Sequence, residues 1–170
     1  VLEHNEGHLK GNSQLLLEGI KNIPDGCEYT IILEADTWIY YDRNIRTYID
    51  ELEENEKTVW ASADWYDKQY GLAIDFDIIK TKYLLDNHKL FDFDIYPECY
   101  NSNYLRDTGA DYIWIEENMP VHVTSYVPAY PYINDKKHKR FYVFPESRMV
   151  THHTEFLKKG MAQWKKSVKG

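Results

Sequence analysis

The sequence predicts an α/β fold in which helices flank a mixed, mostly parallel sheet. Segments with apolar residues at helical spacing alternate along the chain with short runs of β-branched and aromatic residues, and this alternation is typical of an α/β domain. The run from Tyr29 to Leu33 favours a strand throughout and is followed at once by Glu34 and Asp36. In open α/β sheets, ligands bind just beyond the carboxyl ends of such buried strands.

The length and composition of the chain limit its class. A chain of 170 residues is expected to form one domain, 1–170, and its 43% hydrophobic residues provide material for a core. The net charge of −8 argues against a partner such as a nucleic acid or an anionic membrane. No apolar run approaches the roughly 20 residues that span a bilayer. Cys27 and Cys99 form neither a disulfide framework nor a zinc spacing, so a reducing compartment, the cytoplasm, is expected.

The first half of the chain is expected to alternate between helices and strands. A helix is predicted over His8–Asn22, and turn residues in the segment 23–26 end it. The strand 29–33 follows. Asp42 is placed to cap a second helix that runs to Glu56. The apolar side of this second helix is formed by Ile45, Tyr48, Ile49 and Leu52.

The second half continues the alternation. A strand is predicted over 58–63, a loop over 64–69, a strand over 71–76 and a helix from about Asp77, which carries Ile78 and Ile79. A further helix near 97–106 ends at Thr108 and Gly109, a plausible C-cap. The remaining expected elements are strands at 111–115, 121–126 and 141–144 and a final helix at 155–166.

The acidic residues after the first strand suggest a cation site. Glu34 and Asp36 repel each other unless a cation or a shifted pKa relieves the repulsion. A pair of oxygen ligands suits Mg²⁺ or Mn²⁺, ions whose shells are often completed by substrate phosphates. The alternative interpretation is a strand that ends in a solvated acidic turn.

The order of elements and four segments resemble the later part of a GT-A glycosyltransferase domain. The segments are Asn5–Asn12 ahead of the first helix, Leu33–Asp36, the stretch from Gly71 into the next helix, and His152-His153 before a basic helix. The resemblance covers most of this chain but not most of the family's fold. The family's strand–helix units that grip the nucleotide base usually come first, and nothing like them precedes residue 29.

The resemblance implies a metal-dependent glycosyltransferase of the hexosyltransferase type. Its donor would be a nucleotide-diphosphate sugar, UDP- or GDP-linked, and its acceptor a hydroxyl group of a glycan or another molecule. The family's Asp-x-Asp triplet, which holds Mn²⁺ or Mg²⁺ and the diphosphate, corresponds here to Glu34 and Asp36. Asp36 matches the metal ligand, whereas Glu34 departs from the pattern and would reach the donor ribose or a metal-bound water.

Late residues complete the implied donor site. His152 is a candidate third metal ligand, because a late histidine has this role in several GT-A families and imidazole is a common ligand for Mn²⁺-class ions. Lys158 or Lys159 would touch the diphosphate, unless both belong to an exposed basic helix end. Trp65, in the expected loop after strand 58–63, would stack on the donor or acceptor sugar.

An inverting enzyme of this class also needs a general base for the acceptor hydroxyl. The candidate carboxylates after Gly71 are Asp92, Asp94, Glu98, Asp107 and Asp111. Glu98 is favoured, because it lies in an aromatic stretch and apolar surroundings raise the pKa of a carboxylate toward the working range of a base. Asp94 is the next candidate. The competing interpretation of Glu98 is a residue that stabilises the start of a helix.

Two other functions remain open from the sequence. A nucleotidyltransferase would share the sheet and the acidic metal site, although no Gly-rich basic phosphate loop is visible. A non-catalytic carbohydrate-binding module would use the aromatic residues and leave the acids structural. Cation dependence separates the two kinds of protein, because only a transferase should need a metal together with a nucleotide diphosphate.

Overall fold

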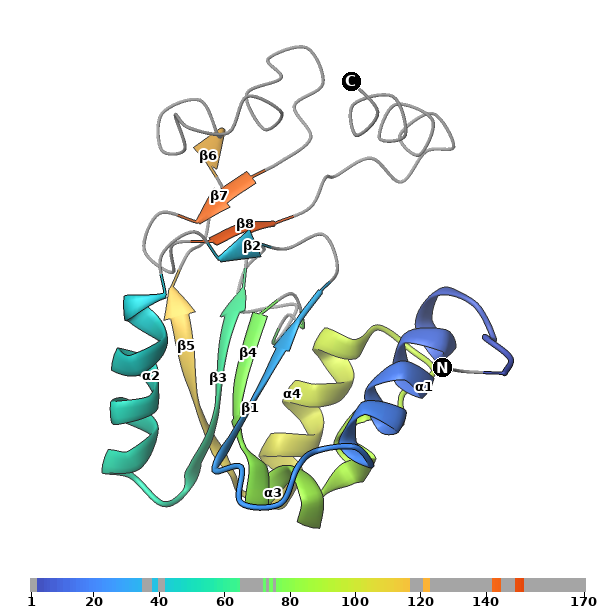
Figure 1. Ribbon diagram of the computed structural model, residues 1–170, viewed down its shortest axis with the longest axis horizontal. Coiled ribbons are helices and arrows are strands. Elements are labelled where there is room, and N and C mark those ends of the chain that lie inside the picture. The colour runs from blue at the N-terminus through green and yellow to red at the C-terminus, as the bar shows by residue number, and fades with distance from the viewer. Residues whose placement is uncertain are drawn as a thin grey trace.

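The computed structural model describes residues 3–34, 38–39, 42–64, 72, 74, 76–116, 121–122, 142–144 and 149–151. These residues form two four-stranded sheets, and helices flank the first of them (Figure 1). Sheet A contains β1 (Tyr29–Leu33), β4 (Phe76–Lys80), β3 (Thr58–Asp64) and β5 (Asp111–Glu116), in that order. Sheet B contains β2 (Trp38–Ile39), β8 (Met149–Thr151), β7 (Tyr142–Phe144) and β6 (Val121–His122).

Three strands of sheet A point in one direction. β4 is antiparallel to both β1 and β3, whereas β3 and β5 are parallel. The expected α/β arrangement, a mixed sheet flanked by helices, is confirmed. Fewer neighbouring strands are parallel than the sequence suggested, because β4 enters between β1 and β3 in the opposite direction. β1, β3 and β5 still deliver their carboxyl ends to the same edge, which we call the carboxyl edge.

Helices cover both faces of sheet A. On one face, α2 (Arg43–Glu54) packs through Leu52 against Phe76 and Ile78. The other face carries α1 (His8–Ile20), α3 (Thr81–Asp86), the 3-10 helix η1 (His88–Phe91) and α4 (Pro97–Thr108).

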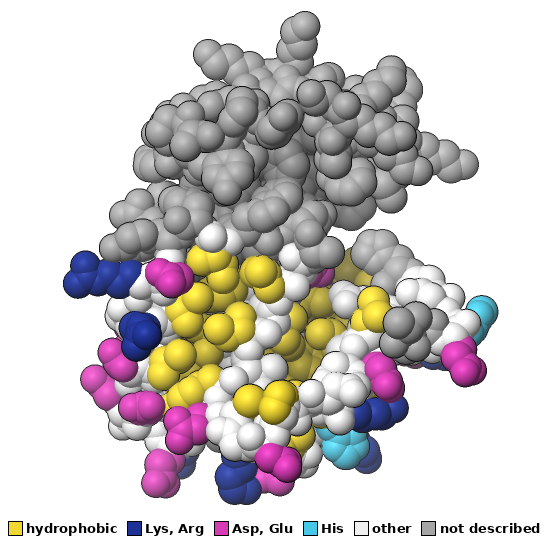
Figure 2. All heavy atoms as spheres, in the orientation of Figure 1, with side chains coloured by type: hydrophobic (Ala, Val, Ile, Leu, Met, Phe, Trp, Pro, Cys, Tyr) yellow, Lys and Arg dark blue, Asp and Glu magenta, His cyan; other side chains and the backbone are white. Residues whose placement is uncertain are grey.

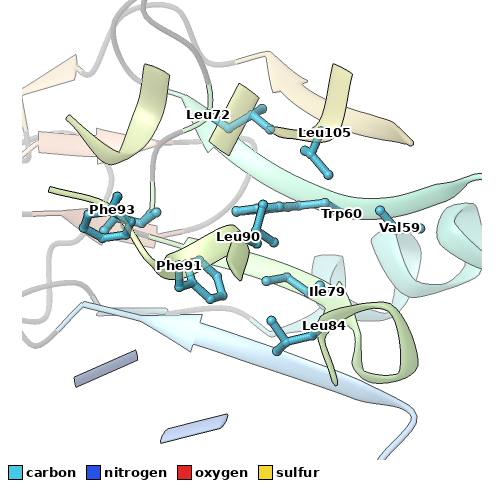
Figure 3. Close-up of a cluster of buried hydrophobic side chains, with 10 residues drawn as sticks. Val59, Trp60, Leu72, Ile79, Leu84, Leu90, Phe91, Phe93 and Leu105 are labelled. Atoms are coloured by element: carbon cyan, nitrogen blue, oxygen red, sulfur yellow. The ribbon is translucent and has the colours of Figure 1, made fainter. Parts of the chain in front are cut away.

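The core of this second face is built around Trp60. Its indole is fully buried and meets the Phe91 ring edge-to-face, with ring centroids 5.7 Å apart. Figure 3 shows Trp60 between Leu105 of α4 and Ile79 of β4. Burying aromatic rings of this size dominates the stability of a core.

The helix ends agree with the sequence at several points. α4 begins with Pro97, whose missing N–H costs nothing at this position. It ends at Gly109 with φ 69°, a left-handed conformation that glycine adopts without strain, as the sequence predicted. Asp42 occupies the N-cap position of α2, but its side chain makes no capping hydrogen bond. None of the described helices is both long and apolar enough to cross a membrane.

The predicted strand at 71–76 and the helix from Asp77 are wrong. The strand runs from Phe76 to Lys80, and the helix begins only at Thr81. Ile78 and Ile79, expected in this helix, belong to β4 and are buried on opposite faces of the sheet. Their β-branched side chains fit a fully buried strand, in which adjacent residues point to opposite sides.

Sequence reasoning also missed three short elements. They are β2, η1 and β8. β2 and β8 each contain only two or three residues, too few for an alternating pattern to show. The expected loop at 64–69 lies, apart from Asp64, outside the described residues, and so does the expected final helix at 155–166.

Asn101 is a buried polar residue of α4 whose replacement should stabilise the protein. Its side chain is fully buried, and both amide atoms lack a hydrogen-bond partner within the part of the chain that the structure describes. Because an unsatisfied buried polar group costs about 1–3 kcal/mol, we expect Asn101→Leu to raise the free energy of unfolding by that order. Thermal denaturation would register about 2–4 °C per kcal/mol.

The matched control is Asn103→Leu, at an exposed position of the same helix. This control should change the melting temperature little, because its amide is solvated in the folded protein. A lower melting temperature for Asn101→Leu would show that the buried amide is stabilising after all.

Candidate functional site

The carboxyl edge of sheet A gathers acidic positions from three strands. β1 ends at Leu33, and Glu34 follows it directly. β3 ends at Asp64 and β5 at Glu116, and these two residues are register partners across the parallel pair. Each of the three parallel-running strands therefore ends in, or immediately before, an acidic residue.

Two of the acidic positions, at the ends of β3 and β5, continue backbone rows that begin in the buried core. Alternate residues of a strand share a face. Position 64 follows Trp60 and Ser62 in this alternation, and position 116 follows Trp114. Trp60 and Trp114 belong to the core beneath α1 and α4, and positions 64 and 116 continue the backbone rows of these two residues.

A buried polar row lies one step below the acidic positions. Asp77 of β4 pairs in register with Ser62 of β3, which pairs with Trp114 of β5. Asp77 and Ser62 are both fully buried. The indole N–H of Trp60 donates a hydrogen bond to Asp77 Oδ1 at 2.6 Å. Burying a carboxylate has a large desolvation cost unless hydrogen bonds such as this one stabilise it. The interior beneath the carboxyl edge therefore contains polar groups.

Three helices begin toward the carboxyl edge of sheet A. α1, α2 and α4 all begin on the side where β1, β3 and β5 end (Figure 1). The first N–H groups of a helix have no partner inside the helix and carry a partial positive charge. No side-chain hydrogen bond caps any of these three helices. The edge thus combines acidic positions, which suit cations, with backbone groups that suit anions.

Glu98 lies in the first turn of α4 and is partly buried. Burial raises the pKa of its carboxyl group, because the charged form loses water; a hydrogen bond from its own backbone N–H opposes this in part. Pro97 and Phe93 beside it are buried. Asp94, the alternative candidate, is exposed in the segment that leads into α4.

The topology reduces the number of candidate general bases. Asp107 lies in the last turn of α4, and Asp111 begins β5. Both positions belong to the opposite edge of sheet A, because β5 runs from there to Glu116. Asp92 is exposed beyond η1. Of the five carboxylates, only those before or within the first turn of α4 are compatible with chemistry at the carboxyl edge.

Most of the predicted donor-site residues lie outside the described part of the chain. They are Asp36, Trp65, His152 and Lys158. Glu34 is described and is partly buried. Among the described residues, no group of three His, Cys, Asp or Glu side chains is arranged to hold a metal ion.

Sheet B pairs two strands that adjoin, in the sequence, the predicted metal ligands Asp36 and His152. β2 and β8 are antiparallel neighbours, with Trp38 opposite Val150 and Ile39 opposite Met149. β2 begins two residues after Asp36, and β8 ends immediately before His152. The sequence had given no reason to expect this pairing.

Sequence reasoning missed three acidic residues of this region. They are Asp64, Asp77 and Glu116. A usable signal was present for two of them, because Asp64 and Glu116 each follow a run of strand-prone residues, as Glu34 does. Asp77 carried no such signal, since it was assigned to a helix.

Comparison with known proteins adds no assignment. No protein-family model matches the chain, and no curated protein is significantly similar to it in sequence.

Proposed function

We propose that this chain is a metal-dependent glycosyltransferase that moves a hexosyl group from a nucleotide-diphosphate sugar to an acceptor hydroxyl. The observation that carries the proposal is the carboxyl edge of sheet A, where Glu34, Asp64 and Glu116 follow or end three strands and three helices begin. This combination can serve a cation and a diphosphate together.

The metal ligands in this proposal are Asp36 and His152, with Glu34 as their partner. The β2–β8 register supports it, because Trp38, two residues after Asp36 in the sequence, pairs with Val150, two residues before His152. One carboxylate and one imidazole, with phosphate oxygens to complete the shell, suit Mn²⁺ and less well Mg²⁺. When bound, such an ion neutralises charge that develops on the leaving diphosphate.

The acceptor side of the reaction belongs to Glu98. Its carboxyl group lies in the first turn of α4, at the carboxyl edge, where burial shifts its pKa toward that of a useful base. In an inverting transfer, the Glu98 carboxylate takes the proton from the acceptor hydroxyl, the acceptor oxygen forms the new bond to the anomeric carbon, and the bond from that carbon to the diphosphate breaks, so that the nucleotide diphosphate leaves. Asp94, exposed just ahead of the helix, is the alternative base.

The remaining predicted contacts belong to the donor. Lys158 would approach the diphosphate as a point charge, and Trp65 would stack on a sugar ring. Recognition of the nucleotide base is expected beside β1, the end strand of sheet A as described. Ile31 and Leu33 of β1 are 43% and 44% exposed. Figure 2 shows hydrophobic side chains gathered in the middle of this face of the molecule, with charged side chains around its margin.

Calorimetric titration of UDP and of GDP, with and without Mn²⁺, tests the proposal. Metal-dependent binding is the expected result, and it would identify the preferred base. A nucleotidyltransferase would instead prefer a nucleoside triphosphate with the metal. Sugar binding that needs neither nucleotide nor cation would mark a carbohydrate-binding module and contradict the proposal.

A further inference from the structure

Ser102 of α4 joins two segments that are far apart in the sequence. Its hydroxyl donates a hydrogen bond to the backbone carbonyl oxygen of Glu98, at 2.8 Å. The Ser102 hydroxyl oxygen in turn accepts a hydrogen bond from the backbone N–H of Leu72, at 3.0 Å. The hydroxyl acts once as donor and once as acceptor, so the two bonds do not compete.

Leu72 is held by its side chain as well as by its backbone. The side chain is fully buried and belongs to the same core cluster as Trp60, Phe93 and Leu105. Because Leu72 lies between β3 and β4, the connection between these strands is anchored to α4 at this residue. Ser102 lies in the second turn of α4, one turn beyond Glu98.

Leu72 and the first turn of α4 are linked through the Ser102 hydroxyl. Leu72 N and the Glu98 carbonyl oxygen are both within hydrogen-bond distance of the Ser102 hydroxyl oxygen. The hydroxyl bond supplements the helix at Glu98, since a serine that bonds the carbonyl four residues earlier stays within the helical geometry. A shift of the connection at Leu72 would therefore change the surroundings of the first turn of α4.

We propose that Ser102 is a positioning residue for Glu98. By holding the chain at Leu72 against the first turn of α4, it keeps water from part of the Glu98 carboxyl group and fixes the position of that group at the carboxyl edge. The role rests on the proposed function, in which Glu98 takes the acceptor proton.

The variant Ser102→Ala tests the proposal without any need for a substrate. Carbon-13 NMR titration of the Glu98 carboxyl group should give a pKa closer to the usual glutamate value, because burial of the group decreases. Exchange of the Leu72 amide hydrogen should become faster. Ser102→Thr keeps the hydroxyl and should restore both properties. If the pKa of Glu98 is unchanged in Ser102→Ala while Leu72 exchanges faster, Ser102 is only a structural anchor and the proposal fails.

Thr108→Ala is the matched control. The Thr108 hydroxyl also bonds the carbonyl oxygen four residues earlier, that of Tyr104, at 2.9 Å, but at the far end of α4. Its loss should leave the pKa of Glu98 and the exchange of Leu72 unchanged. If Ser102→Ala does not fold, Ser102→Cys retains most of the volume and weakens both hydrogen bonds, and the same two measurements apply to it.

Transfer assays then connect the two proposals. In Ser102→Ala, kcat should fall about 10-fold to 100-fold with donor KM unchanged, since small displacements of a reacting group have effects of this size. Ser102→Thr should recover most of the activity. If the unmodified protein neither binds a nucleotide diphosphate nor transfers a sugar, the proposed function fails, whereas the NMR titration still decides whether Ser102 controls Glu98.

Discussion

Asp36→Ala is expected to abolish metal-dependent binding of a nucleotide diphosphate. Asp36 comes two residues after Glu34 and two residues before β2 in the sequence. Losing an outer-shell partner of a metal ligand typically costs about 10-fold to 100-fold in metal affinity. Losing a direct ligand is therefore expected to cost at least about 100-fold, which calorimetric titration with UDP or GDP and Mn²⁺ would detect.

Asp25→Ala is the control for that experiment. Asp25 is exposed in the turn that precedes β1, at the opposite end of the strand. Removing its charge should leave nucleotide binding unchanged and so separates a local effect from one on net charge. Circular dichroism of both variants would check that the fold is retained. If Asp36→Ala binds nucleotide with the same dependence on Mn²⁺ as the unmodified protein, Asp36 is not the metal ligand.

Glu98→Gln is expected to remove turnover while donor binding is kept. The amide of glutamine has nearly the shape of the carboxyl group, but it cannot take up the proton of the acceptor hydroxyl. General base catalysis contributes about 10²–10⁴-fold to a rate, so kcat should fall by that order. Steady-state assays and calorimetry on the same preparation would measure the two properties separately. Unchanged turnover would remove Glu98 from the mechanism.

The pH dependence of turnover provides a second test of Glu98. A general base works only when it is deprotonated, and burial raises the pKa of this carboxyl group. The value of kcat/KM should therefore rise with pH to a plateau, with a midpoint above the usual pKa of glutamate. Asp94→Asn should leave the midpoint in place; a midpoint that moves in Asp94→Asn and not in Glu98→Gln would transfer the role to Asp94.

The free energy of unfolding should also depend on the protonation of Glu98, but it should fall as the pH rises, whereas kcat/KM should increase. Because the pKa of Glu98 is higher in the folded state, the protonated group stabilises the fold at pH values below its ordinary pKa. This contribution is lost as the pH rises through the pKa of the folded state. Chemical denaturation as a function of pH should show a smaller loss in Glu98→Gln, whose amide does not titrate.

Much of the fold was predictable because the helices and central strands carry strong local patterns. α1, β1, α2, β3, α4 and β5 occur within a few residues of their expected places. The region of β4 failed for a physical reason. Ile78 and Ile79 fit one face of a helix as well as they fit a doubly buried strand, and only the neighbouring strands of the sheet decide between the two.

The candidate site was less predictable than the fold. Glu34 could be recognised from the sequence, because a charged residue directly after a run of strand-prone residues is easily seen. The joining of Asp64 to Glu116 depends on which strands become neighbours, and no local pattern contains that information. The same holds for β2 and β8, since residues near 38 and near 150 meet only after most of the chain has been placed.

β5 is an edge strand of sheet A as described, and the sheet is complete only when β5 has paired with β3. Its partner β3 is more than forty residues earlier in the sequence, and β4, α3, η1 and α4 lie between them. When strands so far apart in sequence pair, the entropy of closing the loop between them is lost before any contact stabilises the pair. Such parallel pairs therefore form slowly. The antiparallel strands β3 and β4 are separated by a shorter stretch and can pair first. We therefore expect the docking of α4 and β5 to be the last step in the assembly of sheet A, so that Asp64 and Glu116 come together, and Glu98 reaches its place, only in that step.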